Sequence, residues 1–255
     1  MSAAFDTVAP GYDEVALSRL GRLLRARVHR RVLAGLEPGS HVLDLGGGTG
    51  IDAVDLARAG HRVTLVDSSP AMVTLANRRA RAAGVELTTV TADLDDMGET
   101  GRLPAAPGPG GWNLVLSNFG ALNALADPVG ILDAVAPKVE PGGRAVIVVM
   151  GRICPWELLR GRGRRLTGEA APEDGSTATV RYHRASVMSL SLRRWRESDR
   201  ESLGWALPPF ESRGVIESRP RLAGVLAGLD RFGAPLMGRL GIGDHWLMVL
   251  DRVES

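Results

Sequence analysis

Short apolar segments alternate with helix-like segments between residues 41 and 150, and this alternation restricts the fold more than any other feature. The apolar segments span residues 41–45, 61–67, 85–93, 112–118 and 144–150. Nearly continuous apolar strands of this kind indicate a parallel sheet that is covered on both faces. Because crossovers between parallel strands are right-handed, we predict an α/β fold with a doubly wound sheet and helices on both faces.

The segments on either side of this alternation complete one domain, which a length of 255 residues allows. An N-terminal helix is predicted over residues 15–34, where the apolar positions Leu17, Leu20, Leu24 and Val28 recur at helical spacing. After residue 150 the alternation stops. Two more strands are predicted at 200–207 and 245–253, with a helix over about 218–240 between them.

The composition excludes several classes of protein. One cysteine, Cys154, cannot form an internal disulfide or a cysteine-rich zinc site, and we predict no metal. The N-terminal residues do not resemble a signal peptide, and no stretch approaches the ~20 apolar residues of a membrane span. We therefore expect a cytoplasmic protein with no membrane partner. The net charge of +2 and the absence of a concentrated basic face argue against a nucleic-acid partner.

The turn "DLGGGTG", residues 44–50, predicts the ligand. A dinucleotide site requires G-x-G-x-x-G, but Ile51 stands at the third glycine position, and the G-K-[ST] of a phosphate-binding loop is absent. Asp44 at the tip of the first strand would repel a pyrophosphate, whereas it suits an ammonium group. S-adenosylmethionine carries an amino group and no phosphate. The glycines allow the backbone to approach such a ligand closely.

Three downstream residues fit the same ligand. Asp67 ends the second strand, where an acid can accept both ribose hydroxyl hydrogens. Asp93 ends the third strand, where a carboxylate can accept from the adenine amino group, although Asp95 and Asp96 are alternative acids. Met72, one turn into the following helix, can pack on the adenine face.

Five motifs occur in order along the chain: D-L-G-G-G-T-G, V-D-S-S-P-A-M, T-A-D, N-L-V-L-S-N and P-G-G-R-A-V-I. Together with "FDTVAPGYDEVA" they resemble the class I S-adenosylmethionine-dependent methyltransferases, in particular the ubiquinone-type and natural-product enzymes. The resemblance covers about residues 5–150. It implies a Rossmann-like, seven-stranded, mostly parallel sheet with an antiparallel last strand, an N-terminal helix and an inserted cap.

The resemblance also assigns roles to segments and residues. It implies lid helices at 1–40, a cofactor-binding core at 41–150, a variable acceptor-binding insert at 151–199, and a final helix and strand pair at 200–255. Tyr12 would close over the cofactor, and Gly46 and Gly48 would line its methionyl part. Ser117 and Asn118 end the fourth strand near that part, with a purely structural role in the turn as the alternative. The predicted cofactor-binding residues are Tyr12, Asp44, Gly46, Gly48, Asp67, Ser68, Met72, Asp93, Leu94 and Ser117.

Some methyl acceptors need a base that removes a proton, and the chain has five histidines. His41 and His61 begin parallel strands, which places them at the wrong edge of the sheet, and His29 is predicted to lie in solvent on its helix. His245 and His183 remain as candidate catalytic bases. His245 would begin the antiparallel last strand at the cofactor edge, and His183 lies in the variable insert. For both residues a structural role is the alternative.

The insert supplies further candidates for acceptor binding. Four tryptophans that follow residue 150 would line an apolar acceptor pocket or belong to the core: Trp156, Trp195, Trp205 and Trp246. The arginines between residues 160 and 165 form either a solvated loop or an anion site.

The leading hypothesis is therefore a monomeric or homodimeric methyltransferase that acts on a small molecule, in bacterial secondary metabolism, and releases S-adenosylhomocysteine. The alternatives are an RNA or other nucleic-acid methyltransferase, and a protein that binds S-adenosylmethionine without methyl transfer.

Overall fold

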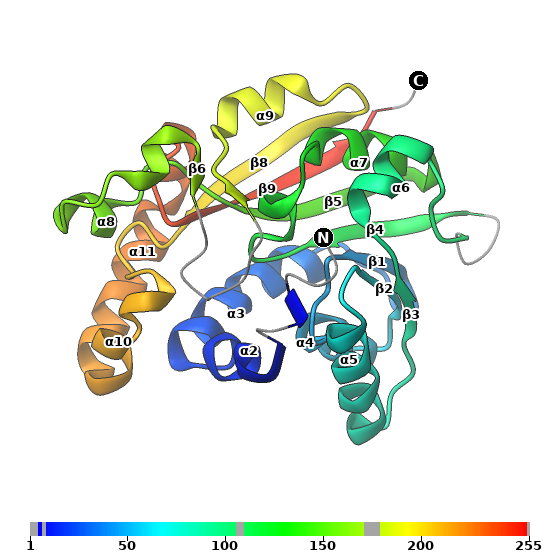
Figure 1. Ribbon diagram of the computed structural model, residues 1–255, viewed down its shortest axis with the longest axis horizontal. Coiled ribbons are helices and arrows are strands. Elements are labelled where there is room, and N and C mark those ends of the chain that lie inside the picture. The colour runs from blue at the N-terminus through cyan, green and yellow to red at the C-terminus, as the bar shows by residue number, and fades with distance from the viewer. Residues whose placement is uncertain (1–4, 7–8, 106–109, 171–178, 254–255) are drawn as a thin grey trace.

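A computed structural model describes residues 5–6, 9–105, 110–170 and 179–253. Seven strands form one mixed sheet in the order β3-β2-β1-β4-β5-β9-β8 (Figure 1). Strands β1 to β5 are parallel, and β9 is antiparallel to both of its neighbours. The sheet consists of β1 (His41–Leu45), β2 (Arg62–Asp67), β3 (Thr88–Thr91), β4 (Trp112–Ser117), β5 (Val139–Met150), β8 (Trp195–Leu203) and β9 (His245–Arg252). The predicted α/β fold with a doubly wound sheet and an antiparallel last strand is confirmed.

Helices cover both faces of this sheet and enclose a core on each side (Figure 1). On one face lie α6 (Leu94–Thr100), α7 (Pro128–Val135) and α9 (Ala185–Ser191). The other face carries α3 (Arg19–Leu33), α4 (Ile51–Arg58), α5 (Pro70–Ala83), α10 (Gly214–Ser218) and α11 (Pro220–Leu240). The remaining helical segments and the small second sheet are α2 (Ala9–Ala16), α8 (Pro155–Leu159), η1 (Ala121–Ala124), η2 (Ala136–Lys138), η3 (Arg164–Thr167), η4 (Phe210–Ser212), β6 (Glu169–Ala170) and β7 (Val180–Arg181). Within the described ranges, no helix has the length and apolar character needed to cross a bilayer.

The N-terminal helix differs from its prediction. It is interrupted at residues 17–18, so that α2 ends at Ala16 and α3 begins at Arg19. Ser18 caps α3, because its side chain accepts a hydrogen bond from the Gly21 N–H. Leu20, Leu24 and Val28 are buried as predicted, whereas Leu17 lies at the break and is exposed.

Two strands of the second half of the sheet start earlier than predicted. β8 begins at Trp195 rather than residue 200, because its alternating side chains pair with the whole length of β9. β5 begins at Val139 rather than residue 144. Residues 140–143, "EPGG", lie inside β5, where the pairing with β4 shifts register between Trp112 and Leu114.

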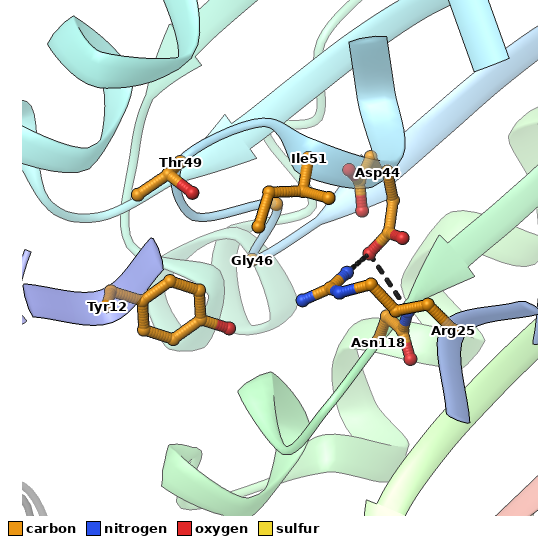
Figure 2. A pocket seen from close by; sticks show the side chains of 9 residues that line it. Tyr12, Arg25, Asp44, Gly46, Thr49, Ile51 and Asn118 are labelled. Atoms are coloured by element: carbon orange, nitrogen blue, oxygen red, sulfur yellow. Dashed lines mark hydrogen bonds and ion pairs between the residues drawn. The ribbon is translucent and has the colours of Figure 1, made fainter. Parts of the chain in front are cut away.

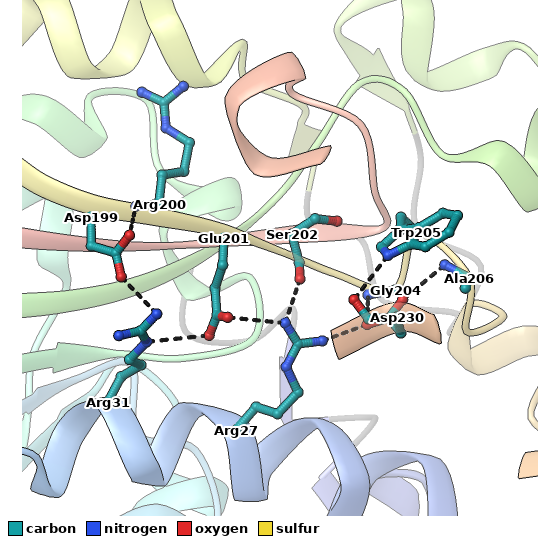
Figure 3. Close-up of polar contacts among 10 residues, drawn as sticks. All are labelled: Arg27, Arg31, Asp199, Arg200, Glu201, Ser202, Gly204, Trp205, Ala206 and Asp230. Atoms are coloured by element: carbon teal, nitrogen blue, oxygen red, sulfur yellow. Dashed lines mark hydrogen bonds and ion pairs between the residues drawn. The ribbon is translucent and has the colours of Figure 1, made fainter. Parts of the chain in front are cut away.

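A buried ion-pair cluster joins α3 to the β8 edge of the sheet (Figure 3). Arg27 on α3 pairs with Asp230 on α11 and with Glu201 on β8, and it donates to the Ser202 carbonyl at 2.7 Å. Asp230 is fully buried, and it also accepts hydrogen bonds from the backbone N–H groups of Gly204, Ala206 and Leu207. Three distant segments therefore depend on one carboxylate.

We expect Asp230→Ala to lower the free energy of unfolding by about 3–5 kcal/mol, because it leaves the Arg27 guanidinium buried without its partner. Asp230→Asn, which keeps the shape and one acceptor oxygen, should cost less. Denaturant unfolding measures both effects. Glu86→Ala removes an exposed acid and is the control. An Asp230→Ala loss no larger than that of Glu86→Ala would contradict this role.

Candidate functional site

A pocket lies at the carboxyl ends of β1 and β4, and side chains of α2 and α3 also line it (Figure 2). This is the edge at which open α/β sheets bind ligands. The residues that line it are Tyr12, Arg25, Asp44, Gly46, Gly47, Thr49, Ile51, Asp52 and Asn118. The predicted residues Tyr12, Asp44 and Gly46 therefore come together, whereas Arg25 and Asp52 were not predicted.

At Gly46 and Gly50 the glycine turn approaches its neighbours too closely for a side chain. A Cβ at Gly46 would lie 2.3 Å from the Ala121 Cβ, and one at Gly50 would lie 2.8 Å from the Ala76 Cβ. Both glycines have positive φ, +69° and +75°, which other residues rarely adopt. Gly46 and Gly47 line the pocket, so backbone of the turn forms part of its wall.

Asp44 places a buried acceptor without a partner in this pocket. Its side chain is 1% exposed, and among the described residues no donor reaches its Oδ2 atom. Burial raises the pKa of Asp44 well above its ordinary value, and the nearby Asp52 charge raises it further. An ammonium group within hydrogen-bond distance would satisfy this carboxylate, and that group is the one predicted for the methionyl end of the ligand.

Asp67 ends β2, as predicted, and holds the turn. Its two carboxylate oxygens accept from the Gly48 N–H and the Ser69 N–H, each at 2.9 Å. Burial raises the pKa of Asp67, against the effect of these two hydrogen bonds. Each oxygen retains a second lone pair. The side chain can therefore accept from ribose hydroxyls while it stays in place.

The N-terminal segment docks on the turn beside Tyr12. Thr49 donates its hydroxyl to Asp13 at 2.6 Å, and Arg79 on α5 pairs with the same carboxylate. Tyr12 lines the pocket, and a Cβ at Gly48 would lie 4.0 Å from its ring. This arrangement fits the predicted closing role of Tyr12.

One buried carboxylate that sequence reasoning missed organises the pocket wall. Asp52 in the first turn of α4 pairs with Arg25 on α3, contacts the His29 Nε2 at 2.7 Å and accepts from the Asn118 amide at 2.9 Å. Burial alone would raise the pKa of Asp52, but Arg25 and His29 outweigh burial and hold it well below its usual range. The expectation that His29 lies in solvent is wrong, because Asp52 provides it with a partner. The only signal in the sequence was an acid two residues after the turn.

The residues predicted to bind the adenine end of the cofactor also cap a helix or pack in the protein interior. Asp93 caps α6 by accepting from the Asp95 N–H at 3.0 Å. Leu94 and Met72 are buried, and Met72 lies in the first turn of α5, as expected. Ser69 caps α5, and the role of the neighbouring Ser68 in cofactor binding stays a prediction.

Ser117 lies at the end of β4, as predicted, but its hydroxyl already binds a backbone carbonyl rather than pointing free toward a cofactor. It is fully buried and donates its hydroxyl to the Leu45 carbonyl at 2.9 Å. This contact joins β4 to β1. It gives Ser117 a structural role, which was the predicted alternative to cofactor binding.

His245 begins β9 opposite Met150, the last residue of β5, so it lies at the cofactor edge of the sheet, as predicted. Its Nδ1 contacts the Asp244 carboxylate at 2.9 Å, and Asp244 also pairs with the buried Arg165 at 2.8 Å. Its ring makes edge contacts with Phe119 and Phe210. His245 is 2% exposed, and no hydrogen-bond donor or acceptor within the described ranges reaches its Nε2.

His183 lies at the same end of β5, in a bridge with Gly151. Burial lowers its pKa, and the charges of Arg152 and Arg181 lower it further, against a hydrogen bond with the Leu122 backbone. Its Nε2 atom is buried, and no partner for it is found in the described part of the chain. Both candidate bases therefore present a free ring nitrogen near the end of β5.

Two of the four tryptophans, Trp195 and Trp246, belong to the core, which was the alternative to an acceptor pocket. Trp195 begins β8 opposite Arg252, at the far edge of the sheet, and donates to the Leu132 carbonyl. Trp246 is buried in the core next to β5. The prediction that the arginines between residues 160 and 165 lie in a solvated loop is wrong for Arg165. This side chain is buried and forms ion pairs with Glu157 and Asp244.

Comparisons with known proteins agree with this geometry. A family model described as "Methyltransferase domain" matches residues 42–143. The ubiquinone biosynthesis O-methyltransferase of Xanthomonas campestris pv. campestris (strain B100) is 25% identical over 182 residues, which cover 71% of this chain and 72% of that enzyme.

Two solved structures share the fold. The cyclase SpnF has a TM-score of 0.65 at 19% identity and covers 100% of this chain and 95% of its own. An S-adenosylmethionine-dependent methyltransferase from Methanosarcina mazei has a TM-score of 0.62 at 15% identity, over 88% of this chain and 98% of its own. The fold, the turn and the family model all indicate the same cofactor chemistry.

The His29–Asp52 contact should make stability depend on pH. Burial alone would lower the pKa of His29, but the hydrogen bond and charge of Asp52 raise it. The stabilisation is complete below about pH 6.5, the ordinary histidine value, and is lost as the pH rises through the raised pKa. We expect His29→Gln to remove this fall in the free energy of unfolding. Thermal unfolding of both proteins across pH 5–9 measures it, and parallel curves would show that the contact contributes nothing.

Proposed function

Because the chain belongs to the class I S-adenosylmethionine-dependent methyltransferases, we propose that it methylates a small organic acceptor through an oxygen atom. The observation that carries the proposal is the buried Asp44 carboxylate, which has no described hydrogen-bond partner at Oδ2 and lies beside a glycine turn. A pocket wall with this charge selects a cationic ligand over a phosphate.

Four side chains would hold the cofactor. Asp44 would accept from its amino group, Asp67 from its ribose hydroxyls, and Tyr12 would cover it from the N-terminal segment. Met72 would pack at the adenine end. When bound, S-adenosylmethionine supplies a methyl group that the sulfonium has already activated. The remaining task of the protein is to position the acceptor and to remove its proton.

His245 is the base that we propose for this proton. Its Nδ1 faces Asp244, which favours the tautomer with hydrogen on Nδ1 and leaves the Nε2 lone pair free. Arg165 pairs with Asp244, and the pKa of this carboxyl lies well below its usual range because His245 and Arg165 outweigh burial. Nε2 would take the acceptor's hydroxyl proton while the new oxygen–methyl bond forms. His183 is the second candidate, with its ring fixed by the Leu122 backbone.

The acceptor that this site suits has an apolar body and a hydroxyl group. Phe119 and Phe210 meet edge-on beside His245, with ring centroids 5.9 Å apart. Phe119 also contacts Arg25 of the cofactor pocket, so it lies between the two halves of the site. The Xanthomonas relative is named as an O-methyltransferase, which supports oxygen as the methylated atom. We propose a tailoring step in bacterial secondary metabolism as its setting.

Cofactor binding should depend on Asp67. We expect Asp67→Ala to weaken S-adenosylhomocysteine binding by about 10- to 100-fold, because hydrogen bonds to a charged group are lost. Asp67→Asn should weaken it less. Isothermal calorimetry gives the affinities, and thermal unfolding reports any damage to the turn. Glu86→Ala, which removes an exposed acid before the start of β3, is the control. Unchanged affinity in Asp67→Ala would remove the ribose assignment.

Substitutions of the two histidines should differ in their effect on kcat. We expect His245→Gln to reduce kcat on a panel of phenols that includes catechol and caffeate by about 100-fold or more, the usual size of general-base catalysis, with S-adenosylhomocysteine affinity unchanged. His183→Gln is the matched comparison. A loss confined to His183→Gln would move the role to that residue. Tight cofactor binding without transfer to any phenol, amine or bulk tRNA would favour the non-methylating alternative.

A further inference from the structure

One face of α11 is fixed against the protein. Ala223, Asp230, Ala234 and Gly238 are buried along this face. At Gly238 the helix comes so close to β8 that a Cβ would lie 2.7 Å from the Glu201 Cα. The rotation of α11 about its axis is therefore set, and its other face must point away from the core.

That outer face carries an apolar stripe over the whole length of the helix. Phe232 is 89% exposed, which is unusual for so large a hydrophobic side chain. The exposed apolar residues follow one another at intervals of three or four, so they share one face: Leu222, Val225, Leu229, Phe232, Leu236 and Leu240. We call this set the α11 stripe. A contiguous apolar surface of this kind marks an interaction site.

The charges beside the α11 stripe are positive. Arg221, Arg231 and Arg239 are exposed on α11, and Arg219 is exposed just before it. The acid of α11, Asp230, is fully buried and already paired with Arg27. On the adjacent α10, the exposed Glu217 accepts from the Leu20 N–H of α3. The exposed charges that α11 itself contributes are thus arginines.

A second exposed apolar element begins beside the end of α11. Ile153 bridges Ile242, which follows the helix, and α8 starts two residues later. Leu159 at the end of α8 is highly exposed. Figure 1 shows α8, α10 and α11 along one side of the molecule.

We propose that the α11 stripe and its arginines dock the protein on an anionic lipid surface. A helix with leucine, valine and phenylalanine on one side and arginine at the margins lies in the plane of a membrane interface. The apolar side chains would enter the acyl boundary, and the arginines would contact acidic headgroups. The sequence-based expectation of no membrane partner relied on the absence of a spanning segment, which a surface helix does not need.

A second copy of the chain fits this surface less well. In an antiparallel pair of α11 helices, Arg221 of one copy would lie near Arg239 of the other, and a parallel pair would place each arginine beside its equivalent. Like charges repel at such positions, and α11 exposes no acid within its described residues to compensate them. An acidic lipid surface supplies the missing charge.

Flotation with lipid vesicles tests the proposal on the full chain. We expect binding to vesicles of phosphatidylcholine mixed with phosphatidylglycerol, weaker binding to phosphatidylcholine alone, and loss of binding as salt increases. The double variant Phe232→Ser with Leu236→Ser should reduce binding by about tenfold or more, because two apolar anchors are lost. Arg231→Glu with Arg239→Glu should weaken binding only to the anionic vesicles.

Leu190→Ser on α9 is the matched control, because Leu190 is 87% exposed but lies outside the α11 stripe. All variants should bind S-adenosylhomocysteine as the parent does, which shows that they are folded. No binding to anionic vesicles, or equal binding by the parent and the Phe232→Ser with Leu236→Ser variant, would overturn the proposal. A concentration-dependent dimer in analytical ultracentrifugation that the same variant abolishes would assign the stripe to a second copy instead.

Discussion

Two buried arginines on one helix determine how the parts of this protein fit together. Arg25 and Arg27 are buried on α3, and a buried guanidinium is tolerated only with a carboxylate partner. Asp52 on α4 pairs with Arg25, and Asp230 on α11 pairs with Arg27. Through these two pairs α3 links the pocket to the far edge of the sheet. The positions of α3, α4 and α11 relative to one another are therefore fixed by charge as well as by apolar packing.

The same ion pairs define what the pocket can bind. Asp52 has Arg25, His29 and Asn118 as partners, so its charge is compensated. Asp44 stands close by with one oxygen that no described donor reaches. A ligand that brings a positive group would complete the balance, whereas a phosphate would add to the excess of acid. The preference for a cationic cofactor follows from this difference between two neighbouring carboxylates.

Those parts of the fold and site that depend on local patterns could be predicted from the sequence. The apolar strands, the glycine turn and the acids at the ends of β1 and β2 were predicted correctly, because the carboxyl ends of parallel strands meet at one edge. Asp52 and Arg25 were missed because a buried arginine looks like a surface arginine in sequence. Arg27 and Asp230 are 203 residues apart, so no local pattern reveals their contact. The start of β8 at Trp195 was missed because it depends on the pairing of β8 with β9.

Because some charged side chains are buried, the charge on the surface differs from the net charge of the chain. The formal value of +2 suggests an almost neutral surface. The acids that are buried within the described residues are Asp44, Asp52, Asp67, Glu157, Glu201, Asp230 and Asp244, whereas the buried arginines are Arg25, Arg27 and Arg165. More negative than positive groups are therefore withdrawn from the solvent, and the surface is more basic than the composition indicates. The groups that touch a partner directly are the exposed ones, so composition alone underestimates how basic the contact surface of this protein is.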